Sequence, residues 1–246
     1  MENTNNSVSV NNVSMVFNLA TEKVDSLKEY VLKLLKRELM IQEFYALRDV
    51  SLEVDRGDAV ALIGTNGSGK STLLKVIAGV MHPTKGSVTV RGSIAPMIEL
   101  GAGFDPELTA RENVFLNGAV LGYDRKFMEE HFKSIIDFAE LWDFVDVPVK
   151  NYSSGMVARL GFAIATEVTA DVLIVDEVLA VGDFRFQEKC KKRMAEMMSG
   201  GTTLLFVSHS TEQVRQLCKK ALWIKKGRVQ MFGEVNEVCN AYEADV

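Results

Sequence analysis

The chain has 246 residues, of which 47% are hydrophobic and 25% are charged, a composition typical of a globular protein rather than of a disordered or collagen-like one. It has 28 lysines and arginines against 33 aspartates and glutamates, a net charge of -5, so nucleic acid is not expected as a partner. Three widely spaced cysteines form no CxxC motif and fit a reducing cytoplasm. The N-terminus does not resemble a signal peptide, and no apolar run approaches the roughly 18 residues of a membrane span.

The N-terminal third of the chain alternates between strand and helix patterns. Residues 8–17 alternate as a strand does, whereas the apolar residues within 22–43 recur every three or four positions and predict an amphipathic helical insertion. Strands are predicted at 46–54 and 59–63, and a helix at 71–78.

The remaining pattern predicts an α/β core interrupted by a mostly helical subdomain. The subdomain is expected at about 95–165, opened by a capping box at Thr109 and Glu112. The core then comprises about 8–94 and 166–246, and the whole chain reads as one domain. Its later strands are expected at 172–175, 203–207, 221–224 and 229–232, followed by a short last helix.

A glycine-rich segment between the strand at 59–63 and the following helix satisfies the phosphate-loop motif GxxxxGK[ST]. Glycines let backbone N–H groups turn inward around phosphate oxygens, and the helix N-terminus adds partial positive charge. We expect Lys70 to contact the β and γ phosphates of a nucleotide and Ser71 to bind Mg²⁺. The predicted nucleotide-binding residues here are Gly64, Thr65, Asn66, Gly67, Ser68, Gly69, Lys70, Ser71 and Thr72.

Two acids, Asp176 and Glu177, end the apolar run 172–175. A carboxylate at this strand end suits the Mg²⁺ shell, and a second suits activation of the attacking water, as phosphoryl transfer requires. Asp176 is therefore predicted as a metal ligand and Glu177 as the general base. No NKxD motif supports guanine specificity, so ATP with Mg²⁺ is the expected nucleotide.

The segment Tyr152-Ser153-Ser154-Gly155-Met156, just before the strand that ends in the two acids, resembles the LSGGQ signature of ABC ATPases. Residues 180–183 stand in the D-loop position of that family, and the resemblance covers practically the whole chain. It implies a P-loop NTPase fold with an inserted helical subdomain. It also implies a head-to-tail homodimer in which Ser154 and Gly155 close over the nucleotide held by the other copy.

The resemblance also suggests roles for residues outside the main motifs. His209 stands where the family has its switch histidine, so it is expected to sense the γ-phosphate. Glu99 replaces the usual Q-loop glutamine and is a candidate for the Mg²⁺ or water shell. Three aromatics, Phe17, Phe44 and Tyr45, are candidates for stacking on adenine, and the sequence does not choose among them.

The motifs ELGAGF, PELTARENV, YSSGMVARLGFA and VDEVLAVGD resemble the branch of ABC ATPases that exports O-antigen, teichoic acid and related rhamnose-containing polymers. The resemblance implies a peripheral ATPase on the cytoplasmic face of the cell membrane, working with a separate transmembrane permease on a lipid-linked polysaccharide. The insertion at 22–43 also matches this branch, although simple packing on its own domain is an alternative.

Several alternatives stay open from the sequence. The chain is also compatible with an ABC transporter ATPase for a different cargo, including an importer, or with a soluble ABC ATPase that does not transport. A P-loop kinase is disfavoured by the signature. Some exporters of this branch append a C-terminal carbohydrate-binding domain, and a chain that stops at Val246 is either a short form or a piece of a longer one.

Overall fold

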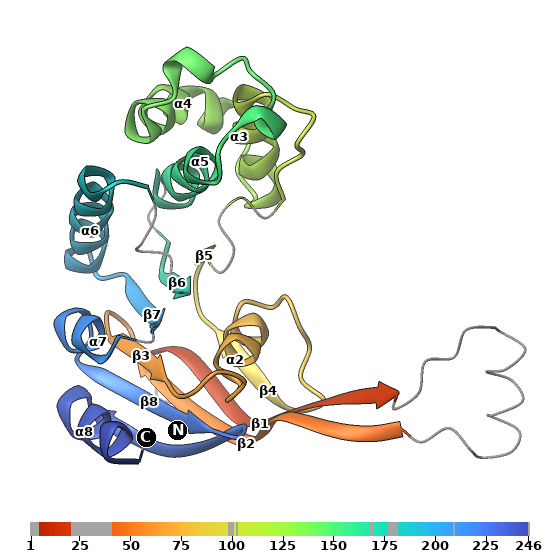
Figure 1. The fold of residues 1–246 in the computed structure, drawn as a ribbon, viewed down its shortest axis with the longest axis vertical. Coiled ribbons are helices and arrows are strands. Elements are labelled where there is room, and N and C mark those ends of the chain that lie inside the picture. Colours follow the sequence, from red (N-terminus) through yellow and green to blue (C-terminus); the bar gives the residue numbers. More distant parts are fainter. Residues whose placement is uncertain are drawn as a thin grey trace, which may run out of the picture.

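The protein is built around a parallel sheet with a helical lobe above it and an antiparallel sheet beside it, as Figure 1 shows. This computed structural model describes residues 5–20, 41–97, 101, 103–167, 170–176, 182–208 and 210–245. Among these residues, no helix is both long enough and apolar enough to cross a bilayer.

The strands form two sheets. The six-stranded sheet has the order β5-β6-β7-β3-β8-β9 and is parallel except for β9, and the three-stranded antiparallel sheet has the order β2-β1-β4. The predicted core strands are all present. Their bounds are β1 Asn6–Ala20, β2 Ile41–Asp55, β3 Ala59–Ile63, β4 Lys85–Val90, β5 Ile94–Met97, β6 Val172–Asp176, β7 Thr203–Val207, β8 Lys220–Lys225 and β9 Arg228–Glu234.

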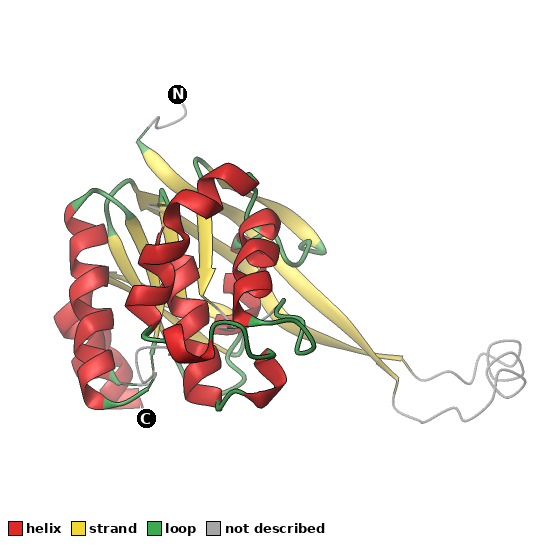
Figure 2. Ribbon diagram, turned by 90° about the horizontal axis from the view of Figure 1, so that it is seen from above, coloured by secondary structure: helices red, strands yellow, loops and turns green. Residues whose placement is uncertain are grey.

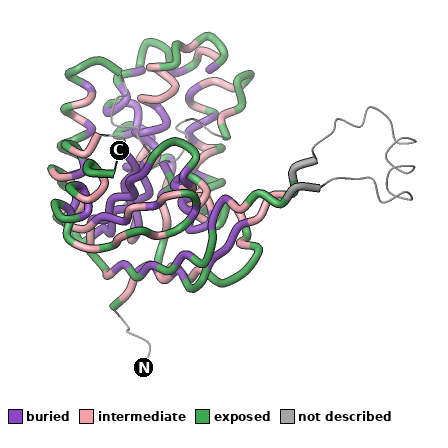
Figure 3. The backbone as a smooth tube through the Cα atoms, turned by 60° about the horizontal axis from the view of Figure 1, so that its bottom comes forward, coloured by how far each residue is buried: buried purple, intermediate pink, exposed green. Residues whose placement is uncertain are grey.

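The central strands are apolar throughout because both faces of the parallel sheet are covered. On β3, Ala61 and Ile63 belong to a core shared with the helical lobe, whereas Val60 and Leu62 pack against α2 and the antiparallel sheet. All five residues of β3 and of β7 are buried. Figure 3 shows the buried residues concentrated inside the body of the protein and the exposed ones around it.

The helices lie over the sheets, and most of them begin at a recognisable cap. Figure 2 shows several helices side by side in front of the strands. The predicted capping box is present, since the Thr109 hydroxyl accepts from the Glu112 N–H while the Glu112 carboxylate accepts from the Thr109 N–H. The bounds are α2 Lys70–Ile77, α3 Ala110–Val120, α4 Arg125–Ala139, α5 Ser154–Glu167, α6 Phe184–Ser199, α7 Thr211–Leu217 and α8 Val235–Asp245, with short 3₁₀ turns η1 Trp142–Phe144 and η2 Val149–Asn151.

The N-terminal boundary of the helical lobe differs from the expected one. Residues 95–97, assigned above to the helical subdomain, belong to β5, which pairs in parallel with β6 in the core sheet. Pairing with β6 overrides the weak local pattern, and the core shared with the helical lobe buries Ala95 and Met97. Within the described residues, the lobe consists mainly of α3, α4 and α5.

Strands β1 and β2 form a long antiparallel ribbon that extends beyond the body (Figure 1). Its register pairs Phe17 with Phe44 and Ala20 with Ile41. Residues 41–43 are therefore strand, so the helical insertion expected at 22–43 is wrong at its C-terminal end. The rest of that prediction, within residues 21–40, lies outside the described residues.

Candidate functional site

The glycine-rich loop joins β3 to α2 and places the first turn of α2 at the edge of a pocket. Gly69 occupies the N-cap with φ 111°, in the left-handed region that favours glycine, and no side chain caps the helix. The first N–H groups of α2 therefore receive no side-chain cap and are available to an anion.

The back of the loop is held very close to two other segments. A Cβ on Gly69 would lie 2.6 Å from the Ala46 carbonyl oxygen of β2, and one on Gly227 would lie 2.7 Å from the same atom. The Gly227 N–H donates to the Ser68 carbonyl across 2.8 Å, and the Arg48 N–H donates to the Gly227 carbonyl across 2.7 Å. The β8–β9 turn and β2 thus support the loop from behind.

Lys70 lies inside the loop rather than in solvent. Its side chain is buried, and its Nζ donates to the carbonyl oxygens of Gly64 at 2.7 Å and Thr65 at 3.0 Å. The Ser68 hydroxyl is also buried, and among the described residues it has no hydrogen-bond partner. A buried hydroxyl without a partner is costly, so a ligand that could bond to it would gain free energy.

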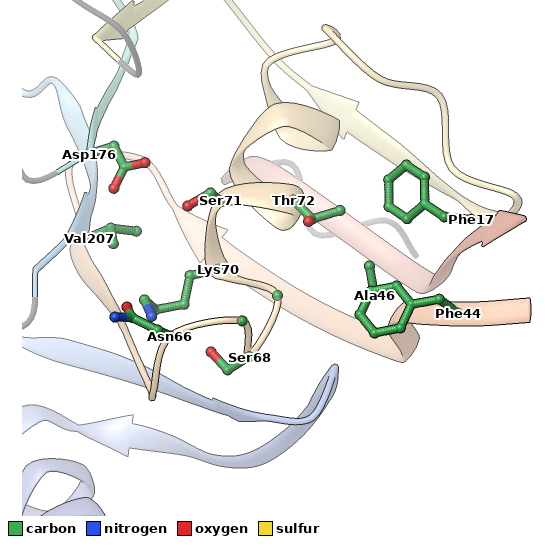
Figure 4. Close-up of a pocket in the computed structure, with 12 residues that line it drawn as sticks. Phe17, Phe44, Ala46, Asn66, Ser68, Lys70, Ser71, Thr72, Asp176 and Val207 are labelled. Carbon is green, nitrogen blue, oxygen red and sulfur yellow. The ribbon is translucent and has the colours of Figure 1, made fainter. Parts of the chain in front are cut away.

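The loop lines a pocket of about 470 Å³, within the roughly 300–1,000 Å³ common for small-molecule sites. Figure 4 shows Lys70, Ser71 and Asp176 at one part of this pocket and two phenylalanines at another. Asp176 ends β6 and pairs in register with Val207 at the end of β7. Since β7 also pairs with β3, which leads into the loop, the parallel sheet places Asp176 on the same side as the loop. The lining residues are Phe17, Phe44, Ala46, Asn66, Gly67, Ser68, Gly69, Lys70, Ser71, Thr72, Asp176 and Val207.

These residues fit a magnesium-bound nucleotide by their chemistry. The uncapped helix start and Lys70 suit phosphate oxygens, whereas the Ser71 hydroxyl and the Asp176 carboxylate supply the oxygen atoms that Mg²⁺ prefers. In the part of the chain that is described, no cluster of three or more histidine, cysteine, aspartate or glutamate side chains could hold a metal.

The three aromatic candidates for stacking on adenine differ in their position relative to the pocket. Phe17 and Phe44 face each other as Cα partners across the ribbon, and both line the pocket. Tyr45 is not among the lining residues. Its ring lies under the Arg48 guanidinium at 4.3 Å, and its hydroxyl donates to Glu43 across 3.2 Å. The structure therefore favours the two phenylalanines.

The segment that resembles the signature begins α5. The Ser153 hydroxyl accepts from the Met156 N–H at 3.2 Å, so Ser153 caps the helix and Ser154 and Gly155 lie in its first turn. Neither Ser154 nor Gly155 is among the residues that line the pocket of the same chain. Their predicted action on a second copy is thus compatible with their position.

An ion pair between α5 and the N-cap of α6 was not predicted from the sequence. Arg159 donates to the Asp183 carboxylate across 2.5 Å, and its guanidinium lies over the Phe186 ring at 4.8 Å. Asp183 also caps α6, and this bond from the Phe186 N–H, followed by the charge of Arg159, lowers the pKa of the carboxyl group. The signal available in the sequence was a charged residue on the signature helix and another in the D-loop position.

Three predicted residues, Glu99, Glu177 and His209, lie outside the described residues. Their roles as metal ligand, general base and γ-phosphate sensor stay predictions. Near the first of them, Gly101 has φ 83°, and a Cβ there would lie 2.6 Å from a methyl group of Val157 on α5. Gly101 thus lies close to the signature helix.

Comparison with known proteins places these motifs in a family. The family model described as ABC transporter matches residues 47–180. The O-antigen export system ATP-binding protein RfbB of Klebsiella pneumoniae is 48% identical over 202 residues, which is 82% of each chain. The chain belongs to the ABC transporter family. The teichoic acids export ATP-binding protein TagH of Bacillus cereus is 42% identical over 240 residues, 98% of this chain but 43% of that protein.

Solved structures share the fold of this ABC cassette. A dimeric ATP-binding cassette in a post-hydrolysis state, bound to ADP and Pi, matches with a TM-score of 0.73 and 22% identity over 93% of this chain and 98% of that one. An ATP-binding subunit of an ABC transporter matches with a TM-score of 0.75 and 22% identity, over 96% and 93%. The predicted fold class is therefore confirmed.

Proposed function

We propose that this ABC cassette binds and hydrolyses ATP to power export of a lipid-linked cell-surface polysaccharide through a separate transmembrane permease. The observation that carries the proposal is the 48% identity, over 82% of both chains, to an ATP-binding protein named for O-antigen export. The likeness to a teichoic acid exporter supports a glycan cargo but leaves the polymer open. In this proposal the cassette acts at the cytoplasmic face of the membrane.

The pocket residues suggest how the cassette would promote phosphoryl transfer. Lys70 and the N–H groups at the start of α2 would stabilise negative charge on the transferred group. Ser71 and Asp176 would hold Mg²⁺, which would supply positive charge to neutralise the phosphate groups. Glu177 would accept a proton from the attacking water.

Two copies of the chain would complete two sites at their shared interface. Ser154 and Gly155, in the first turn of α5, would contact the γ-phosphate held by the other copy, and His209 would sense its loss. Support for dimerisation comes from the dimeric cassette that shares the fold. Closing and reopening of this dimer would deliver work to the permease.

The experiment is replacement of the native copy by Glu177→Gln in the host, with Glu130→Gln on the exposed face of α4 as the matched control. We expect the first variant to bind ATP, lose turnover and trap lipid-linked glycan on the cytoplasmic side. The control should export normally. The position and chemistry of the trapped polymer would identify the cargo.

The outcomes separate the parts of the proposal. Normal surface glycans, despite a demonstrated loss of ATPase activity and no redundant copy, would contradict export and favour another cargo or a soluble ABC ATPase. Hydrolysis at the normal rate by Glu177→Gln would instead contradict its role as the general base.

A further inference from the structure

A second pocket adjoins the pocket lined by the phosphate loop (the phosphate pocket), and Phe44 lines both. It has a volume of about 610 Å³ and lies between β2 and the β8–β9 hairpin, which pack beside each other. Phe44 and Gly67 line both pockets. The second pocket is lined by Glu43, Phe44, Tyr45, Arg48, Gly67, Lys225, Lys226, Arg228 and Gln230.

Part of the charge in this pocket is already neutralised within the fold. Lys225 donates to both carboxylate oxygens of Asp245 on α8, at 2.6 and 2.9 Å. Glu43, the one acid among the described residues that line the pocket, accepts a hydrogen bond from the Tyr45 hydroxyl. These contacts hold the walls together and leave the other cations to determine what the pocket attracts.

The remaining cations are poorly neutralised. Arg228 approaches Asp49 only to 3.9 Å, and both side chains are more than half exposed. Within the part of the chain that is described, neither Arg48 nor Lys226 has a carboxylate within ion-pair distance. In a chain with a net charge of -5, three such cations around one pocket make a local positive field.

Lys226 carries its charge at an unfavourable backbone position. Its φ of 50° lies in the left-handed region, where glycine or asparagine costs less free energy than lysine. The turn therefore carries a cation at a position whose backbone favours other residues. A lysine that served only solubility could stand at many surface positions without this backbone strain.

We propose that this pocket binds a phosphate-bearing ligand at a site separate from the phosphate loop. Arg228 and Arg48 offer planar guanidinium groups that match phosphate oxygens in pairs, and Lys226 adds a compact charge. The Tyr45 ring under Arg48 holds one guanidinium in place. Both a free phosphorylated compound and a phospholipid headgroup present this chemistry.

Phe44 and Gly67 line both pockets, and through them occupancy of this pocket would be coupled to the nucleotide site. A ligand that restrains Phe44 and Gly67 changes the free energy of binding in the neighbouring pocket, and the effect is reciprocal by linkage. The site is therefore placed to make nucleotide affinity depend on a second anionic ligand.

The test uses the whole chain saturated with Mg²⁺ and ADP, so that the phosphate loop is filled. Radiolabelled inorganic pyrophosphate is measured by equilibrium dialysis, and vesicles of phosphatidylglycerol are compared with vesicles of phosphatidylcholine by cosedimentation. The pocket variant carries Lys226→Gln and Arg228→Gln. The matched control carries Arg125→Gln and Lys133→Gln, which remove the same charge from exposed positions on α4.

We expect the pocket variant to bind one of the two phosphate probes at least about tenfold more weakly than the unsubstituted chain, since each charged hydrogen bond contributes a comparable factor or more. The control should match the unsubstituted chain. A loss confined to pyrophosphate identifies a free ligand, and a loss confined to phosphatidylglycerol vesicles identifies a headgroup.

Two results would overturn the proposal. Equal binding of both probes by the pocket variant and the control would show that these cations form no site. A loss of ADP affinity in the pocket variant when neither pyrophosphate nor vesicles are present would assign the cations to the nucleotide instead. Failure of the unsubstituted chain to bind ADP would contradict the proposed ATPase function alone, because the two variants can still be compared with pyrophosphate.

Discussion

Arg159 and Asp183 join the signature helix to the start of α6 through a charged hydrogen bond of 2.5 Å. The arginine side chain is only 19% exposed, and the same carboxylate caps α6. A Cβ on Gly182 would lie 3.2 Å from the arginine Nε, so the backbone before Asp183 also packs against this side chain. A shift of α5 would therefore act directly on the backbone at Gly182 and Asp183.

We expect Arg159→Gln to lower kcat for ATP hydrolysis by about two- to thirtyfold, which corresponds to a lost coupling of about 0.5–2 kcal/mol. The KM for ATP should change little, because Arg159 does not line the phosphate pocket. Steady-state ATPase assays measure both constants. Arg185→Gln, an exposed change on the helix that Asp183 caps, is the control. A raised KM with unchanged kcat would mean that Arg159 acts on nucleotide binding.

The close contact between Gly227 and the Ala46 carbonyl predicts that a substitution of Gly227 destabilises the fold, although Gly227 does not line the phosphate pocket. Gly227→Ala should destabilise the fold by about 1–3 kcal/mol more than Gly79→Ala, because only the first places a methyl group against the Ala46 carbonyl. Both glycines have φ near 75°, so the backbone strain is matched. Urea unfolding measures the difference, and nucleotide titration should show weaker binding for Gly227→Ala alone. Equal stabilities of the two variants would show that the close contact relaxes freely.

The two phenylalanines that line the pocket predict which aromatic contacts the base. Phe17→Ala and Phe44→Ala should each weaken ATP binding by about two- to tenfold, the effect of losing an aromatic contact of roughly 0.5–1.5 kcal/mol. Tyr45→Ala should leave the affinity unchanged, because its ring packs under Arg48. Calorimetric titration of ATP distinguishes the three variants. Loss of affinity in Tyr45→Ala alone would reverse this assignment.

The three thiols should resist alkylation in the folded protein. Burial raises the pKa of Cys190 and of Cys218 to about 12 and raises that of Cys239. Iodoacetamide at pH 8 should therefore modify none of them until urea is added, as mass spectrometry can show. Thiols of the unfolded chain lose their protons near pH 8.5, whereas the buried thiols of the folded chain keep theirs to higher pH. The contribution of the buried thiols to stability therefore falls as the pH rises from about 8.5 toward 12. Rapid labelling of the native chain at any one cysteine would disprove its protected state.

Much of the fold follows from local signals in the sequence. The apolar runs of β3, β6 and β7 and the capping box at Thr109 were predictable because burial and helix capping act over a few residues. Strand β5 was missed because its place in the sheet depends on pairing with β6, which is distant in sequence.

In the candidate site, too, the features set by local sequence were predictable and those set by long-range packing were not. Residues 66–72 of the loop and Asp176 were predicted from motifs, and they line one pocket, whereas Gly64 and Thr65 are not among its lining residues. The choice of Phe44 over Tyr45 was not predictable, because it depends on which face of β2 meets the loop and on the position of Arg48. The pair of Arg159 and Asp183 likewise arises from the packing of α5 against α6.

The register of the β1–β2 ribbon has a consequence for how this cassette can be varied. Ala20 and Ile41 are paired neighbours, so the chain departs from the ribbon and returns to it at adjacent points. We expect a changed length between these two residues to leave the pairing of Phe17 with Phe44 intact, because added loop length costs little free energy. The end of the ribbon is therefore a position where we expect a new recognition segment to be tolerated while the nucleotide pocket is retained.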